Sequence, residues 1–211
     1  MIKRICIFGA SIAFGSGDFE FGGWQNHLKI WFAKQGKFQH VFNLAISGRT
    51  TDDIIKRFKN ELLVRKSAVL DNEILAIVAI PSNDTRFVVT NKKREFEIPI
   101  EHFQNNLKQL KKLGKKYADK FMFTGITKVV DKKTNPWVVS DGGHCWENKV
   151  IEKYNQVAED FCKENNIPFC PMFDVLEDED LDDGLHPNAD GHRKMFERIR
   201  DFLEEEKIIG K

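Results

Sequence analysis

Five short apolar segments are spaced along the chain, and each has the composition of a buried strand. They are rich in β-branched residues and lack the regular polar positions of a surface helix. The clearest is residues 73–80 (EILAIVAI), and the last is weak because two prolines interrupt it. The predicted strands are residues 2–8, 40–46, 73–80, 120–126 and 168–173.

Between these segments, apolar residues recur at the spacing of amphipathic helices. In residues 51–65 they return every three or four positions, which gives a helix with one apolar face. Thr50 or Thr51 can cap this helix, and Asp52 and Asp53 in its first turn complement the helix dipole. The predicted helices are residues 24–34, 51–65, 99–116, 147–165 and about 188–207.

Alternation of strands and helices is typical of a parallel sheet with helices on both faces. We therefore predict one α/β domain over residues 1–211, with about five parallel strands. Ligands of such sheets bind beyond the carboxyl ends of the strands, so functional residues are expected directly after each strand. The least regular stretch, Val129 to Cys145, is a candidate loop over such a site.

Four polar motifs stand at or near the predicted strand ends, and a parallel sheet would bring them to one edge. Three follow the first three strands, and the fourth precedes the last helix. They are Gly9-Ala10-Ser11, Ser47-Gly48-Arg49-Thr50, Pro81-Ser82-Asn83-Asp84 and Asp183-Gly184-Leu185-His186-Pro187-Asn188.

These motifs contain the groups that ester hydrolysis needs. Ser11 supplies an attacking hydroxyl at a tight turn. His186 can take its proton, because imidazole titrates near neutral pH. Asp183 lies three residues before His186 and is the candidate to orient its ring, with Asp182 as the nearest substitute. The sequence thus predicts a Ser-His-Asp triad.

An oxyanion intermediate also needs hydrogen-bond donors. The candidates are the backbone N–H groups of Ser11 and Gly48 and the side-chain amide of Asn83. Gly48 has no Cβ, so its backbone can approach a substrate closely.

Ser11, Gly48, Asn83 and His186, in this order, resemble the motifs of the SGNH hydrolases, also called the GDSL lipase/acylhydrolase family. The likeness spans nearly the whole chain and is strongest in residues 183–195 (DGLHPNADGHRKM). It implies a flavodoxin-like three-layer α/β/α sandwich and hydrolysis of carboxylic esters through an acyl-serine intermediate. It also implies that Asp183 completes the triad, and that no metal or other cofactor is required.

Two positions depart from the family pattern. Ala10 stands where the family usually has Asp, and Pro81 stands where it usually has Gly. Both change turns that hold the candidate site. A non-catalytic ligand-binding module on the same fold is therefore an alternative, as is a thioesterase or lysophospholipase specialisation of the enzyme.

Other motifs offer weaker alternatives. Asp141 and His144 repeat the Asp-x-x-His spacing within the irregular stretch. The Gly-rich residues 14–17 lack the Gly-Lys-Ser/Thr ending of a phosphate-binding loop, which argues against a nucleotide or flavin binder. We interpret them as a loop beside Ser11 that contacts the acyl or alcohol part of a substrate. His192 is interpreted as a helix packing or capping residue.

Composition narrows the classes of binding partner and substrate further. The 33 basic and 32 acidic residues leave a formal charge of +1, which does not favour nucleic acid or an anionic membrane. No apolar run approaches the ~20 residues of a membrane span. No export signal is recognisable, so we expect a cytoplasmic protein with free thiols that acts on a small-molecule acyl ester. The four cysteines are Cys6, Cys145, Cys162 and Cys170.

Overall fold

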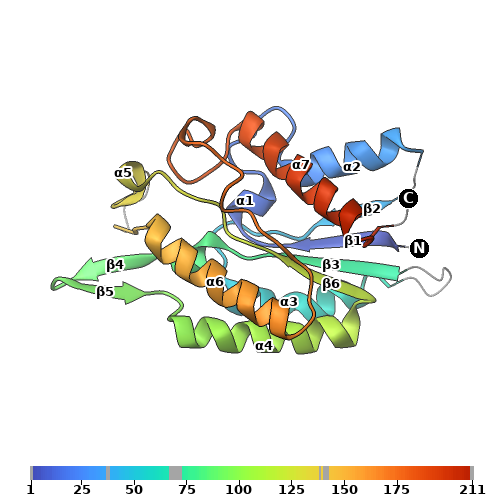
Figure 1. The fold of residues 1–211 in the computed structure, drawn as a ribbon, viewed down its shortest axis with the longest axis horizontal. Helices are drawn as coiled ribbons and strands as arrows, with labels where there is room; N and C mark the ends of the chain where they lie inside the picture. Colours follow the sequence, from blue (N-terminus) through green and yellow to red (C-terminus); the bar gives the residue numbers. More distant parts are fainter. Residues whose placement is uncertain (1, 37–38, 67–72, 138, 140–142, 210–211) are drawn as a thin grey trace.

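A computed structural model describes residues 2–36, 39–66, 73–137, 139 and 143–209. Its central sheet has five parallel strands in the order β2-β1-β3-β6-β7, so the chain switches direction beside β1 (Figure 1). All five correspond to predicted strands. They are β1 (Ile2–Phe8), β2 (His40–Asn43), β3 (Glu73–Ala79), β6 (Lys120–Thr124) and β7 (Phe169–Cys170).

Four strands are shorter than predicted: β3 and β6 end one and two residues early, and β2 and β7 are shortened most. β2 ends at Asn43, whose side chain accepts a hydrogen bond from the Ala45 N–H (3.0 Å), although the Leu44 N–H still donates to the Ile7 carbonyl (2.8 Å). β7 is confined between Pro168 and Pro171, neither of which can donate to a ladder. In β7, strand pairing therefore ends although the apolar pattern continues.

Five long helices cover the two faces of the sheet. α2 and α7 lie on one face, and α3, α4 and α6 lie on the other (Figure 1). The arrangement is the α/β/α sandwich expected from the sequence. The helices are α2 (Trp24–Lys34), α3 (Thr51–Leu63), α4 (Ile100–Tyr117), α6 (Asn148–Glu164) and α7 (Ala189–Glu205).

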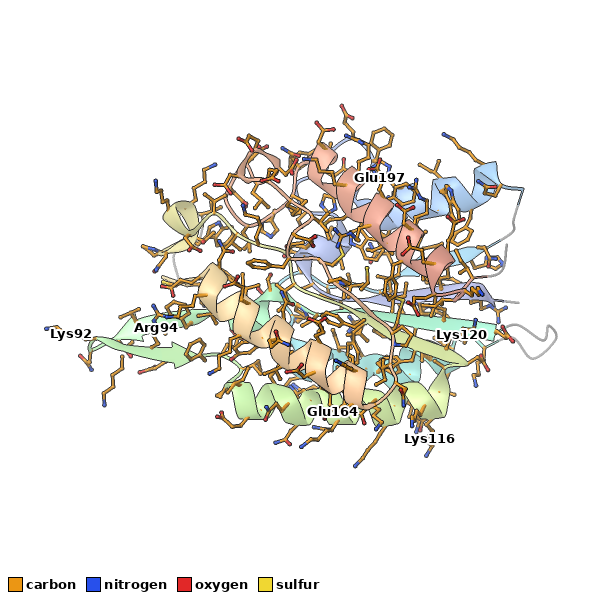
Figure 2. All side chains as sticks on the ribbon, in the orientation of Figure 1. Lys92, Arg94, Lys116, Lys120, Glu164 and Glu197 are labelled. Carbon is orange, nitrogen blue, oxygen red and sulfur yellow. The ribbon has the colours of Figure 1, made fainter. Side chains whose placement is uncertain are left out.

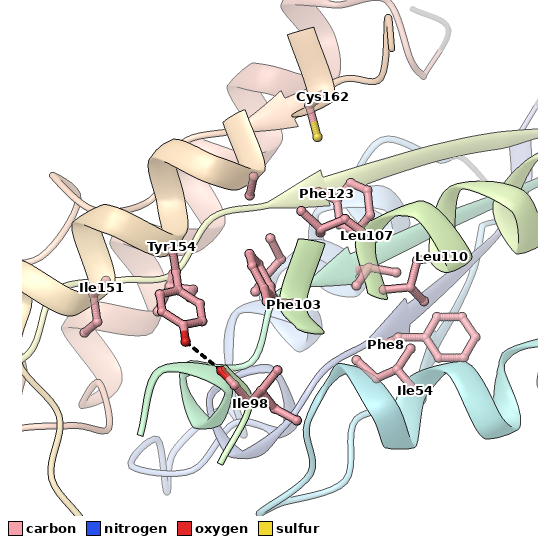
Figure 3. Packing of buried hydrophobic residues seen from close by; sticks show 14 of the residues in the cluster. Phe8, Ile54, Ile98, Phe103, Leu107, Leu110, Phe123, Ile151, Tyr154 and Cys162 are labelled. Carbon is pink, nitrogen blue, oxygen red and sulfur yellow. Dashed lines mark hydrogen bonds between the residues drawn. The ribbon is translucent and has the colours of Figure 1, made fainter. Parts of the chain in front are cut away.

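Side-chain alternation along the strands builds one core on each face. In β1, Phe8 packs with the α3–α4–α6 layer, whereas Ile7 packs with the α2–α7 layer. Figure 3 shows the first core, in which Phe103 and Tyr154 lie between the helices and the Tyr154 hydroxyl donates to the Ile98 carbonyl (2.6 Å). Burial on both faces explains why these strands read as continuous apolar runs.

A β-hairpin between β3 and α4 was not predicted. β4 (Phe87–Thr90) and β5 (Lys93–Phe96) pair antiparallel and extend away from the sheet (Figure 1). Asn91 and Lys92 form the turn with φ of 51° and 62°, and Lys92 lies at the tip of the hairpin (Figure 2). Backbone positions with positive φ are usually occupied by glycine in such turns. This turn has no glycine, so the sequence signal for a hairpin was weak.

Short helical segments complete the described fold. Two of them, α1 and η1, begin at or next to the candidate residues Ser11 and Asn83. None of the described helices is long and apolar enough to cross a membrane. The segments are α1 (Ser11–Phe14), η1 (Ser82–Thr85), α5 (Asp131–Thr134) and η2 (Asp178–Asp180).

Candidate active site

Ser11 is the first residue of α1, directly beyond the carboxyl end of β1 (Figure 1). The turn is closed by hydrogen bonds from the Phe14 N–H to the Ala10 carbonyl (2.8 Å) and from the Gly15 N–H to the Ser11 carbonyl (3.0 Å). Ala10 is buried and carries no side-chain cap, so backbone bonds hold this turn where the family pattern has a carboxylate.

A chain of two hydrogen bonds joins Ser11 to the residues before α7. His186 Nε2 lies 2.9 Å from Ser11 Oγ, and His186 Nδ1 lies 2.7 Å from Asp183 Oδ2. With Nδ1–H donating to the carboxylate, Nε2 is left to accept the serine proton. Asp182 does not take this place, since its carboxylate faces the Asn188 side chain at 3.3 Å.

Asp183 is held as an ionised group. Burial raises its pKa, but the His186 ring and the backbone N–H groups of His186 and Leu185 donate to it and more than offset burial. The net effect lowers the pKa of Asp183 below its ordinary value of 3.8. The carboxylate is therefore charged at neutral pH and can stabilise an imidazolium.

The loops that carry the expected oxyanion donors are joined to one another and to the Ser11 turn. The Ile46 N–H donates to the Gly9 carbonyl (3.1 Å), and the Asn83 side-chain amide donates to the Arg49 carbonyl (2.9 Å). Asn83 is only 4% exposed, and its second amide proton is available for another acceptor. Gly48, with φ of +78°, has a conformation that favours glycine.

Pro81 fits the backbone at its position. Its φ is −67°, which its ring favours, and its carbonyl accepts the Asp84 N–H (3.1 Å) at the start of η1. The departure from the family pattern therefore needs no distortion of the loop.

Asp84, which the sequence places in the same motif as Asn83 without a role, supports the Asn83 turn from beneath. Asp84 is fully buried and accepts hydrogen bonds from the Thr51 N–H (2.9 Å) and the Thr51 hydroxyl. Burial raises the pKa of Asp84 to about 7, and the two bonds from Thr51 counter it only in part. Asp84 thereby ties η1 to the start of α3, which follows the Gly48 loop.

Trp137 is a site residue that the sequence did not single out. Its ring lies edge-on to His186 with centroids 5.7 Å apart, and its Nε1–H donates to the Asp183 carbonyl (3.3 Å). The residue belongs to the irregular stretch from Val129 to Cys145, whose position was predicted but whose contacting side chain was not. Trp137 shields one side of the His186–Asp183 pair.

Asp141 lies outside the described residues, so the alternative pair with His144 stays a prediction. Within the part of the chain that the structure describes, no group of three His, Cys, Asp or Glu side chains is placed to hold a metal ion. The four cysteines are buried free thiols.

His192 in α7 makes hydrogen bonds to Ser16 and Trp24, which is a packing role of the kind expected for it. Its Nε2 lies 3.1 Å from the Ser16 carbonyl, and its Nδ1 accepts from the Trp24 N–H (3.3 Å). Only the neutral ring with a proton on Nε2 satisfies both partners. Burial lowers the pKa of His192, and the Ser16 bond and Asp18 counter it only in part.

Acidification should therefore destabilise the fold through His192. Its pKa is lowered in the folded state, so the unfolded chain binds the proton first as pH falls below ~6.5. Between pH 7.5 and 5.5 we expect the Tm of the wild type to fall about 2–4 °C more than that of His192→Gln, whose amide can still donate to Ser16. Thermal unfolding followed by circular dichroism measures this difference. Parallel pH profiles for the two proteins would contradict it.

One comparison with known proteins identifies a family. A model of the GDSL-like lipase/acylhydrolase family matches residues 7–194. Among curated proteins, no relative matches the sequence.

Solved structures share the fold at low sequence identity. The structure of TesA has a TM-score of 0.69 at 19% identity and covers 96% of this chain and 98% of its own. Axe2, an acetylxylan esterase from Geobacillus stearothermophilus, has a TM-score of 0.72 at 15% identity, with 95% and 94% covered. The psychrotrophic esterase EstA from Pseudoalteromonas sp. has a TM-score of 0.70 at 15% identity, with 98% and 100% covered. At these identities the likeness establishes the fold.

Proposed function

The chain belongs to the GDSL-like lipase/acylhydrolase family and is a carboxylic ester hydrolase, and we propose that Ser11, His186 and Asp183 are its catalytic triad. The observation that carries this proposal is the continuous pair of hydrogen bonds, 2.9 Å and 2.7 Å long, from the Ser11 hydroxyl through the His186 ring to the Asp183 carboxylate. Nucleophile, base and orienting group stand in the order that acyl transfer requires.

In the first half of the reaction, Ser11 Oγ attacks the carbonyl carbon of the ester, and its proton passes to His186 Nε2. Asp183 steadies the imidazolium through Nδ1–H. The carbonyl oxygen takes the negative charge, for which the N–H groups of Ser11 and Gly48 and the Asn83 amide are the proposed donors. The intermediate collapses when Nε2 returns the proton to the leaving alkoxide. An alcohol departs, and the acyl group stays on Ser11.

In the second half, water replaces the alcohol. His186 takes a proton from the water as it attacks the acyl-serine, and then returns it to Ser11 Oγ as the carboxylic acid leaves. In each half of the reaction, His186 Nε2 first accepts a proton and then donates one. The small-molecule ester, the single domain and the cytoplasmic location stay predictions of the sequence.

Covalent labelling tests the nucleophile directly. A fluorophosphonate probe phosphonylates an activated serine, so we expect stoichiometric labelling of the peptide that contains Ser11, located by mass spectrometry. His186→Ala should label far more slowly, because the base is missing. Labelling of a different serine, or no labelling of the folded wild type, would reject this triad. A non-catalytic binding module would give the second result.

Asn83→Ala is expected to lower kcat by about 10²-fold or more, because a side-chain donor to the oxyanion is removed. KM should change little, since that hydrogen bond strengthens only as charge develops. Steady-state kinetics on ethyl acetate measures both constants. Because the Arg49 contact is also lost, the variant's Tm is measured in parallel. A folded variant with wild-type kcat would remove Asn83 from the oxyanion site.

A further inference from the structure

A cavity of about 800 Å³ opens beside the proposed triad. Its walls come from the segment after α1, the start of α2, the end of β2 and the loop that leads to α7. His186 and Asp183 line it, whereas Gly48 and Asn83 are not among the described residues that do so. The cavity therefore adjoins the base of the triad rather than the proposed oxyanion donors.

Reaction geometry assigns a substrate portion to each side of Ser11. The atom that receives the proton from His186 Nε2 is the oxygen of the leaving alcohol, so the alcohol must lie on the His186 side. The carbonyl oxygen must face the donors at Gly48 and Asn83. We propose, on the basis of the function proposed above, that this cavity binds the alcohol portion of the ester, and that it selects an apolar or aromatic alcohol that is neutral or positively charged.

The segment after α1 is a fixed wall of this cavity. Asp18 is 3% exposed, and its carboxylate accepts the N–H groups of Phe21 and Gly23, both at 2.9 Å. Gly15 packs so closely on the same turn that a Cβ on it would lie 1.9 Å from the Gly22 carbonyl oxygen. The wall is thus formed before a substrate arrives, as is usual for ligand pockets.

Two side chains of this wall present ring surface to the cavity. The carbonyl of Phe14 accepts hydrogen bonds from the amides of Gln25 (2.9 Å) and Asn43 (3.2 Å), which fixes the backbone beneath its ring. Phe14 is 55% exposed and Phe19 is 98% exposed, and both line the cavity. Exposed rings that line a cavity favour a flat or apolar group that removes them from water.

The charges around the cavity have one sign. The carboxylates of Asp182 and Asp183 line it, and no lysine or arginine occurs among its described lining residues. Asp182 is exposed; its carboxylate accepts from the Asn188 amide (3.3 Å), while the Lys133 ammonium donates to its backbone carbonyl (3.1 Å) and is not among the described lining residues. A phosphate or carboxylate on the alcohol would be repelled here, whereas an ammonium group would be attracted. The cavity thus disfavours anionic alcohols.

The charge selectivity can be tested with three acetates of one skeleton: 4-methylbenzyl, 4-(aminomethyl)benzyl and 4-carboxybenzyl acetate. The charge lies at the far end of the ring, so the reacting ester is similar in all three. We expect kcat/KM for the carboxy ester to be about tenfold below that of the neutral ester. The ammonium ester should equal or exceed the neutral one. Equal values for all three, or a preference for the carboxylate, would overturn the charge assignment.

The alcohol assignment is tested by the variant Phe14→Ala/Phe19→Ala with benzyl acetate, ethyl acetate and ethyl hexanoate. We expect the ratio of kcat/KM for benzyl acetate to that for ethyl acetate to fall about tenfold. The ratio for ethyl hexanoate to ethyl acetate should not change. Phe21→Ala is the matched control, since Phe21 is also exposed but is not among the lining residues, and it should leave both ratios unchanged.

The outcomes separate this inference from the function on which it rests. If the hexanoate ratio falls instead, the cavity holds the acyl chain and the alcohol assignment is wrong. If neither ratio changes while hydrolysis still requires Ser11, this inference fails and the proposed triad stands. If hydrolysis of ethyl acetate does not require Ser11, both proposals fail together.

Discussion

Ser11→Ala is expected to lower kcat/KM for ester hydrolysis by about 10⁴-fold or more. The substitution removes the only atom that can form the acyl intermediate and leaves the surrounding backbone bonds intact. Ser11 is half-buried at the start of a helical turn, where alanine is well tolerated, so the Tm should stay within about 2 °C of wild type. Initial rates on ethyl acetate and a thermal melt measure the two effects.

Residual hydrolysis in this variant has a defined source. The oxyanion donors and the cavity remain, and such groups alone accelerate hydrolysis over water by about 10³-fold. Activity within tenfold of wild type, in a protein free of contaminating esterase, would show that another group is the nucleophile.

Asp183→Asn is expected to lower kcat by about 10³- to 10⁴-fold. The amide cannot stabilise an imidazolium as a carboxylate does, and its –NH₂ can turn the His186 ring into the tautomer that carries its proton on Nε2. The low pKa of Asp183 means that the wild-type carboxylate is ionised throughout the neutral range. Rates measured from pH 6 to 9 should therefore show the loss at every pH.

Asp190→Asn is the matched control for this variant. Asp190 lies in the first turn of α7 and pairs with Arg193 at the surface (3.2 Å), so it carries the same charge nearby without touching His186. Its kcat should stay within twofold of wild type. A comparable loss in both variants would point to the overall charge of the region rather than to the hydrogen bond at His186.

The positions of the long elements could be predicted because each reflects a single strong pattern. α2 begins and ends at the predicted residues, and the bounds of α4 and α6 differ from prediction by one residue. The proximity of the candidate site residues was predicted for the related reason that a parallel sheet gathers its strand ends at one edge, and their catalytic roles stay a prediction. The contact of Ser11 with His186 was inferred from that topology, and the structure places it at 2.9 Å.

The residues that were missed depend on contacts that periodicity does not encode. Trp137 reaches His186 from a stretch with no regular pattern, and nothing local distinguishes it from a core tryptophan. Asp84 stood in the third motif without an assigned role, because its partner, Thr51 at the start of α3, lies far away in the sequence. The hairpin around Asn91 and Lys92 lacks the glycine by which such turns are usually recognised. Each depends on tertiary neighbours or unusual backbone angles.

The bond between Ser11 and His186 joins residues that are 175 positions apart. Closing so long a segment costs chain entropy, and parallel sheets with distant pairings fold slowly. During synthesis, Ser11 leaves the ribosome well before His186, its proposed base, has been translated. On the proposed mechanism, a nascent chain is unreactive towards esters until its last helix has docked. After denaturation, recovered hydrolysis reports that folding is complete, and it should lag behind the return of the helical circular dichroism signal.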